Sequence, residues 1–164
     1  EEGIGSTFII RIPFKLAPTP DTVKKTAAQM DISGLNLLLV EDNELNAEIA
    51  EMLLSDEGAN LTVVRDGLQA VRMFQEKPEC YFDAILMDIM MPVMDGFTAT
   101  KTIRSLKHPD ADTIPIIAMT ANAFREDKEK CLAAGMNAHL AKPLDIEKME
   151  QTICKQLRDV KIEK

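Results

Sequence analysis

Hydrophobic residues fall into two alternating patterns from Leu35 onward. Short, nearly continuous apolar runs predict strands that are buried on both faces, as in a parallel sheet covered by helices. Five such runs are expected at Asn36–Val40, Leu61–Val64, Ala84–Met87, Ile114–Met119 and Ala138–Ala141. Longer stretches with helical spacing lie between them. The order predicts an α/β fold, a doubly wound five-stranded parallel sheet built from a βα unit repeated five times.

Apolar spacing within the helical stretches predicts which helix faces are buried. The expected stripe of the first helix is Leu45, Ile49, Met52 and Leu53, and that of the last helix is Ile146, Met149, Ile153 and Leu157. Helix ends are marked as well. The capping box is Asp66 with Gln69, the other predicted N-caps are Asp95 and Asp145, and the predicted stops are Gly58 and Gly135.

Polar residues stand where the predicted strands end. Right-handed crossovers place the loops that follow parallel strands at one edge of the sheet, where ligands bind in such folds. The residues expected there are Glu41, Asp42, Asp88, Thr120 and Lys142. Crowded carboxylates repel one another, and a hard divalent cation with oxygen ligands stabilises them. Mg²⁺ fits best, because it takes one or two protein carboxylates and keeps several waters.

This set of side chains has the composition of a phosphoryl-transfer site. Asp88 is the candidate nucleophile, since carboxylates form acyl phosphates. Asp42, with Glu41 through water, would hold the metal, while Lys142 and Thr120 would contact phosphoryl oxygens. Taken one at a time, the same residues also fit an acid pair at a helix start, a solvated lysine and a turn threonine. Because all five residues are expected at one edge of the sheet, we favour the phosphoryl-transfer interpretation over these separate structural roles.

From about Leu35 to Leu157 the chain resembles the receiver domain of two-component response regulators, through LLLVEDNELN, ILMDIMMPVMDG, PIIAMTANA and AHLAKP in that order. The resemblance implies a flavodoxin-like receiver fold in which Asp88 accepts a phosphoryl group from a phosphohistidine. The implied Mg²⁺ ligands are Glu41, Asp42, Asp88 and the backbone carbonyl of Met90. The implied switch pair is Thr120 and His139, although His139 stands where an aromatic residue is commoner. A cis Lys142–Pro143 bond is also implied.

The first fourteen residues, EEGIGSTFIIRIPF, resemble the last strand of the ATP-binding domain of histidine kinases. We therefore expect residues 1–14 to be a remnant of that domain, 15–34 a linker, 35–160 the receiver domain and 161–164 a tail. The strand Ser6 to Ile12 is expected to lack order or to pair with another exposed edge. The parent chain is expected to be a hybrid histidine kinase, which is itself a histidine protein kinase.

Charge and apolar content argue against two classes of protein, nucleic-acid-binding proteins and proteins that span a membrane. The formal net charge of −8 and the pI near 4.8 argue against nucleic-acid binding, which needs a basic face. No apolar run approaches the roughly 20 residues needed to cross a bilayer. A cytoplasmic location without membrane contact is expected for this segment, and a membrane-anchored sensor region in the parent is left open. His108 is expected to lie in solvent.

The predicted function is a phosphoacceptor in a phosphorelay. Its partners would be the phosphohistidine domain of a kinase or a histidine phosphotransfer domain. The segment would catalyse its own phosphorylation and slowly lose the phosphoryl group, so whether to class it as an enzyme stays open. One alternative is a binding module of the same fold that regulates the kinase without phosphorylation. Another, a small-molecule phosphatase, would need an acid two residues after the nucleophile, where Met90 stands.

Overall fold

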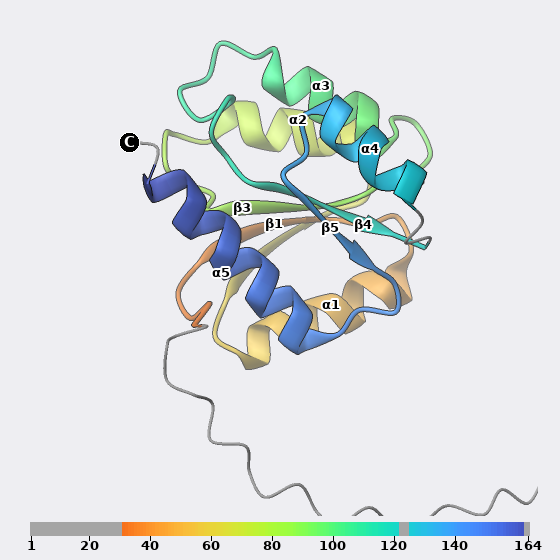
Figure 1. Ribbon diagram of the computed structural model, residues 1–164, viewed down its shortest axis with the longest axis vertical. Helices are drawn as coiled ribbons and strands as arrows, with labels where there is room; N and C mark the ends of the chain where they lie inside the picture. Colours follow the sequence, from red (N-terminus) through yellow and green to blue (C-terminus); the bar gives the residue numbers. More distant parts are fainter. Residues whose placement is uncertain (1–30, 122–124, 163–164) are drawn as a thin grey trace, which may run out of the picture.

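The computed structural model describes residues 31–121 and 125–162, which form a parallel sheet between two layers of helices (Figure 1). The strands are β1 (Asn36–Val40), β2 (Asn60–Val64), β3 (Ala84–Asp88), β4 (Ile116–Thr120) and β5 (Ala138–Ala141). The helices are α1 (Glu44–Asp56), α2 (Gly67–Glu76), α3 (Gly96–Arg104), α4 (Arg125–Ala134) and α5 (Ile146–Ile162). The predicted α/β fold with five βα units is confirmed.

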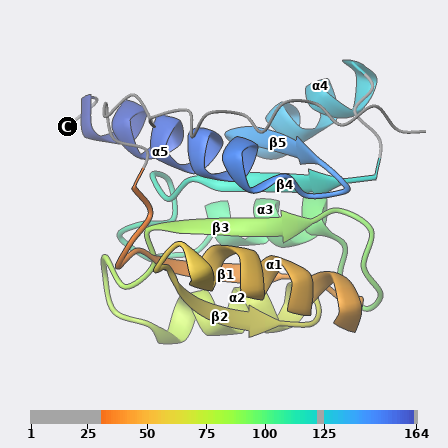
Figure 2. The ribbon, with the colours of Figure 1, turned by 90° about the horizontal axis from the view of Figure 1, so that it is seen from below.

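Helices cover both faces of the sheet, with α1 and α5 on one face and α2, α3 and α4 on the other (Figures 1 and 2). Successive side chains of β1 point to opposite faces of the sheet, so they pack against both helix layers. Leu37 and Leu39 belong to the core under α1 and α5, while Leu38 and Val40 belong to the core on the opposite face. Two buried faces explain why β1 reads as a continuous apolar run.

All strand neighbours are parallel, in the order β2-β1-β3-β4-β5, so their carboxyl ends share one edge (Figure 2). Near that edge, Val40 pairs with Met87 across β1 and β3, and Asp88 pairs with Met119 across β3 and β4. Thr120 pairs with Ala141, the last residue of β5. Register therefore brings segments from across the chain to one edge.

The fourth strand was predicted to begin at Ile114, and this was wrong, because β4 begins at Ile116. Proline has no N–H to donate to a sheet ladder, so Pro115 delays the strand. Its carbonyl still accepts a hydrogen bond from Ile85 N at 2.8 Å. Asp88 and Thr120 are the last residues of β3 and β4, whereas the prediction placed them just after the strands.

The buried face predicted for α1 was also wrong. Leu45, Ile49 and Met52 are exposed, with Leu45 at 64% of its full accessible surface. The buried residues of this helix are Ala47, Ala50 and Leu54. Small alanine side chains let the helix pack closely against the sheet, and a pattern drawn from large apolar residues alone overlooks them. The predicted stripe of α5 is confirmed: Met149 and Ile153 are buried, and Ile146 and Leu157 pack against the same core.

The predicted helix ends are confirmed. Asp66, Asp95 and Asp145 accept hydrogen bonds from Gln69 N, Thr98 N and Lys148 N, the backbone groups three residues further on. Gly58 and Gly135, after α1 and α4, have φ values of +87° and +96°, a left-handed conformation that glycine adopts without steric cost.

His108 was expected in solvent, and this was wrong. Its ring lies 4.6 Å from that of Phe74, centroid to centroid, and its Nε2 lies 3.0 Å from the carbonyl oxygen of Lys77. The histidine is held by residues more than 30 positions away in the chain, so the local sequence around it could not predict these contacts.

Residues 1–30, which include the predicted strand Ser6 to Ile12 and most of the predicted linker, lie outside the described residues. Among the helices of residues 31–121 and 125–162, none combines the length and the apolar content that a bilayer crossing demands.

Candidate functional site

Three acidic side chains meet at the carboxyl edge of the sheet. Glu41 and Asp42 follow β1 directly, and Asp88 closes β3, the neighbouring strand. One carboxylate oxygen from each lies within 4.8 Å of the others. Glu41 is 1% exposed and Asp88 5% exposed, while Asp42 faces solvent. This places three negative charges in a small volume, two of them largely removed from water.

Lys142 supplies a positive charge to this group. Its Nζ lies 2.6 Å from Oε2 of Glu41 and 2.8 Å from Oδ2 of Asp88. Its backbone N donates to the carbonyl oxygen of Thr120 at 2.8 Å, and the Lys142–Pro143 bond is cis, as predicted. Burial lowers the pKa of Lys142, but the hydrogen bonds and charges of Asp88 and Glu41 outweigh that effect and raise the pKa overall. The ammonium group therefore stays charged at neutral pH.

The two predicted switch residues lie on different strands, and only one of these strands neighbours β3. Thr120 is buried and ends β4, next to β3, where it shares the carboxyl edge with Asp88. His139 is half-buried in β5 and pairs with Ala118. Because β4 lies between β3 and β5, His139 is separated from Asp88 by a whole strand.

Asn46 belongs to the site and was missed from the sequence. Its Nδ2 donates to Oε1 of Glu41 at 3.0 Å, and its backbone N donates to Oδ1 of Asn43, the N-cap of α1, at 3.0 Å. The signal was present but weak. An N-cap at Asn43 makes Asn46 the third helical residue, and helical side chains lean toward the helix N-terminus, which here is the carboxyl edge.

The position of Asp88 depends on a glycine in the next helix. A Cβ added at Gly96 would lie 2.2 Å from the carbonyl oxygen of Asp88, closer than any side chain tolerates. The backbone N of Gly96 donates to the carbonyl oxygen of Ile89 at 3.0 Å. Met90 N donates to Oδ1 of Asp88 at 3.3 Å. The start of α3 thus packs directly on the end of β3 and holds the loop between them.

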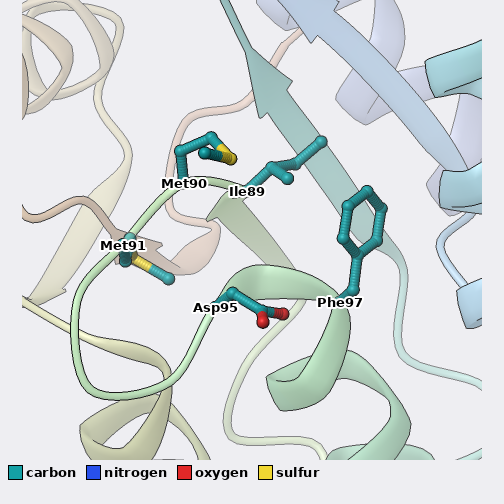
Figure 3. Close-up of a pocket in the computed structure, with 5 residues that line it drawn as sticks. All are labelled: Ile89, Met90, Met91, Asp95 and Phe97. Atoms are coloured by element: carbon teal, nitrogen blue, oxygen red, sulfur yellow. The ribbon is translucent and has the colours of Figure 1, made fainter.

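A shallow pocket with mainly apolar walls is formed by this loop and the start of α3 (Figure 3). Its lining residues are Ile89, Met90, Met91, Asp95 and Phe97. The side chains of Ile89 and Phe97 extend to the same side of the loop (Figure 3). The carboxylate of Asp95 already accepts a hydrogen bond from Thr98 N at 2.7 Å as the cap of α3. Asp88 is not among the residues that line this pocket, so the pocket adjoins the acidic cluster without containing it.

The acidic cluster fits a hard divalent cation. Its donor atoms are carboxylate oxygens, and Asp42 is open to solvent. Oδ1 of Asp88 faces the loop after β3, where it accepts a hydrogen bond from Met90 N. Mg²⁺ uses one or two protein carboxylates and keeps several waters, so a half-open cluster of this kind suits it. One lysine ammonium against three acids leaves the cluster with net negative charge.

Comparison with known proteins gives one consistent family. The sequence model of the response regulator receiver domain matches residues 37–154. A probable histidine kinase from Oryza sativa is 35% identical over 159 residues, covering 79% of this chain. A hybrid signal transduction histidine kinase from Dictyostelium discoideum is 36% identical over 141 residues and also covers 79%. This chain spans 16% and 8% of the lengths of these two relatives.

Solved structures agree on the fold. The receiver domain of a sensor histidine kinase from Pseudomonas aeruginosa, with a magnesium ion coordinated in its active site cleft, is 42% identical. The match has a TM-score of 0.68 and covers 76% of this chain and 98% of that one. A Saccharomyces cerevisiae receiver domain, crystallised with a histidine phosphotransfer protein, is 28% identical. It has a TM-score of 0.67 and covers 76% of this chain and 90% of that chain.

Proposed function

Because this chain belongs to the response regulator receiver family, the phosphoacceptor domains of two-component phosphorelays, we propose that Asp88 is its phosphoacceptor. The observation that supports this most strongly is the placement of Asp88, Glu41 and Lys142. A buried carboxylate at the end of a strand is costly unless it is paired. Here it is paired with an ammonium group, beside a second and a third acid, which is the charge arrangement that a phosphoryl group needs.

The proposed reaction is an in-line phosphoryl transfer. A carboxylate oxygen of Asp88 attacks the phosphorus of a phosphohistidine, the N–P bond breaks, and its electron pair returns to the imidazole nitrogen. The product is an acyl phosphate on Asp88. Lys142 already lies within hydrogen-bond distance of that carboxylate, so its ammonium group is placed to neutralise charge on the transferred oxygens.

A magnesium ion is the proposed cofactor, since Mg²⁺ binding occurs in the family. Asp42, Asp88 and the backbone carbonyl of Met90 would hold it, with Glu41 contributing through water. When bound, it supplies charge neutralisation on phosphoryl oxygens. Thr120, at the same edge, is proposed to hydrogen bond to the phosphoryl group and to act with His139 as the switch.

An exposed apolar surface identifies where the histidine-bearing partner is proposed to bind. Leu45, Ile49 and Met52 lie on one side of α1, and the helix begins two residues after Asp42. Any protein that delivers a phosphohistidine to Asp88 must cover the carboxyl edge, and so it comes to lie against the start of α1. Burial of these exposed apolar side chains by a partner would lower the free energy of the complex. We call Leu45, Ile49 and Met52 the α1 surface.

The proposed partner is the phosphohistidine domain of a kinase or a histidine phosphotransfer domain. Support comes from the yeast receiver crystallised with a phosphotransfer protein and from the kinase relatives. The whole protein is proposed to be a hybrid histidine kinase, with residues 1–14 the end of its ATP-binding domain, residues 15–34 a linker, residues 35–160 the receiver domain and residues 161–164 a tail.

Phosphorylation in solution tests the proposal. The protein is incubated with acetyl phosphate and Mg²⁺, and intact mass spectrometry counts phosphoryl groups. One group is expected on the native protein and none on Asp88→Asn, or when EDTA replaces Mg²⁺. Asp66→Asn is the matched control, because asparagine also caps helices. Equal labelling of the native protein and Asp88→Asn would exclude Asp88 as the acceptor.

A further inference from the structure

A continuous chain of hydrogen bonds runs from α1 to Asp88. Asn46 Nδ2 donates to Oε1 of Glu41 at 3.0 Å, and Lys142 Nζ donates to Oε2 of Glu41 at 2.6 Å. Lys142 Nζ also donates to Oδ2 of Asp88 at 2.8 Å. Glu41 is almost fully buried, so both oxygens of a buried carboxylate are held by protein donors. The orientation of Lys142 therefore depends on Glu41, and that of Glu41 on Asn46.

Asn46 is itself held in place. Its backbone N donates to Oδ1 of Asn43 at 3.0 Å, which anchors the first turn of α1. A carboxylate accepts hydrogen bonds and cannot donate them, so Asn46 must direct its NH₂ group at Glu41. Aspartate has the same shape but only acceptors, and alanine has neither group. The contact thus requires a side-chain donor at this position, which the asparagine amide supplies.

We propose that Asn46 is a positioning residue for phosphoryl transfer, which through Glu41 fixes the Lys142 ammonium group against Asp88 before the phosphoryl donor arrives. The inference rests on the proposed function and adds to it a residue outside the acidic cluster. Without the amide, Glu41 keeps one protein donor, and rotation of its side chain carries Lys142 with it. A displacement of about 1 Å at a reacting centre costs up to about a hundredfold in rate.

Kinetics give the first test. Asn46→Ala and Asn46→Asp are compared with Asn46→Gln, which retains the amide, and with Glu51→Gln, an exposed substitution on the same helix. With acetyl phosphate, the maximal phosphorylation rate of Asn46→Ala and Asn46→Asp is expected to fall about tenfold. All rates are compared at saturating Mg²⁺, so that a change in metal affinity caused by a displaced Glu41 does not enter the comparison. Asn46→Gln should recover most of the rate, and Glu51→Gln should retain all of it.

A second readout needs neither metal nor phosphate. In metal-free protein, NMR detects the Lys142 ammonium protons, and the signal is assigned by its loss in Lys142→Met. Two carboxylate acceptors slow proton exchange with water, so the signal should be sharp in the native protein and in Asn46→Gln, and lost in Asn46→Ala. This holds even if Asp88 proves not to be the phosphoacceptor, so the two proposals fail separately. An unchanged Lys142 signal in Asn46→Ala, together with a native phosphorylation rate, would overturn the inference and leave Asn46 with a structural role in α1.

Discussion

The ammonium nitrogen of Lys142 lies 2.8 Å from Oδ2 of Asp88, although 54 positions separate the two residues and β4 lies between their strands. The contact therefore requires the loop after β5 to reach across the end of β4 toward β3. The hydrogen bond from Lys142 N to the carbonyl oxygen of Thr120, the last residue of β4, secures that path. The ion pair can therefore form only when β3, β4 and β5 lie side by side in the folded sheet.

Replacing Lys142 by methionine should destabilise the protein in the absence of metal. The change leaves Glu41 and Asp88 as buried carboxylates without their cation. Breaking a buried pair costs about 3–5 kcal/mol, and this site borders solvent, so about 2 kcal/mol is expected from urea unfolding in EDTA. Lys148→Met is the matched control, since its pair with Asp145 is exposed and should contribute less than about 0.5 kcal/mol. Similar losses for both variants would contradict a structural role for the Lys142 pair.

The same pair should show a defined pH dependence. The pKa of Lys142 in the folded protein is raised above its ordinary value of 10.5, despite the opposing effect of burial, by hydrogen bonds and charges of Asp88 and Glu41. A raised lysine pKa means that the folded state holds the proton more tightly than the unfolded state. The stabilisation is fully present below the ordinary pKa and is lost as pH rises through the folded pKa. The difference in unfolding free energy between native protein and Lys142→Met should therefore stay constant near neutral pH and shrink in strongly alkaline solution.

The α1 surface should contribute more to partner binding than to stability. Ile49→Ser should lower the unfolding free energy by no more than about 1 kcal/mol, because the side chain keeps 41% of its full accessible surface. It should slow phosphotransfer from a phosphorylated histidine phosphotransfer domain and leave the rate with acetyl phosphate at the native level. Leu54→Ala, on the buried face of the same helix, should instead cost about 2–5 kcal/mol of stability. It should not selectively slow phosphotransfer from the phosphotransfer domain. Equal slowing of both phosphoryl donors by Ile49→Ser would argue against a docking role.

A methyl group at Gly96 should disturb both stability and the site. In Gly96→Ala the new Cβ meets the Asp88 carbonyl oxygen at 2.2 Å, so β3 and α3 must move apart, at a cost of about 1–3 kcal/mol. The phosphorylation rate should fall as Asp88 shifts. Gly34→Ala provides the comparison, because Gly34 has φ of +76° with nothing within 4 Å of an added Cβ. It should cost about 1 kcal/mol through backbone conformation and leave the phosphorylation rate unchanged.

Thiol labelling checks the packing of the three cysteines. Cys80 is exposed, while Cys131 and Cys154 are buried. Burial raises the pKa of the Cys154 thiol, an effect that the Asp31 backbone and the Arg158 charge only partly oppose, so its reactive thiolate is scarce. Iodoacetamide at mildly alkaline pH should modify Cys80 alone in folded protein and all three thiols in urea. Rapid labelling of folded Cys80→Ser would contradict this packing.

Much of this protein follows from local patterns. Apolar runs located all five strands, although Pro115 delayed β4, and residues such as Asp66 and Asp95 marked helix ends through hydrogen bonds to the chain three residues away. Because parallel strands expose their carboxyl ends at one edge, the order of strands alone predicted that Asp42, Asp88 and Lys142 would converge there. The presence of these residues at one edge is therefore a property of the sequence.

Tertiary structure decided what depends on side chains far apart in the chain. Helical spacing gives a period, but packing on the sheet determined that Ala50 and Leu54 face the core and that Ile49 faces solvent. The bridge that Lys142 makes to Glu41 spans 101 positions, and its geometry depends on how closely the elements pack. Local pattern thus fixes which groups reach the site, since strand order and chain direction set the edge. Packing fixes how those groups bond to one another, because contact distances arise only when the whole sheet and its helices come together.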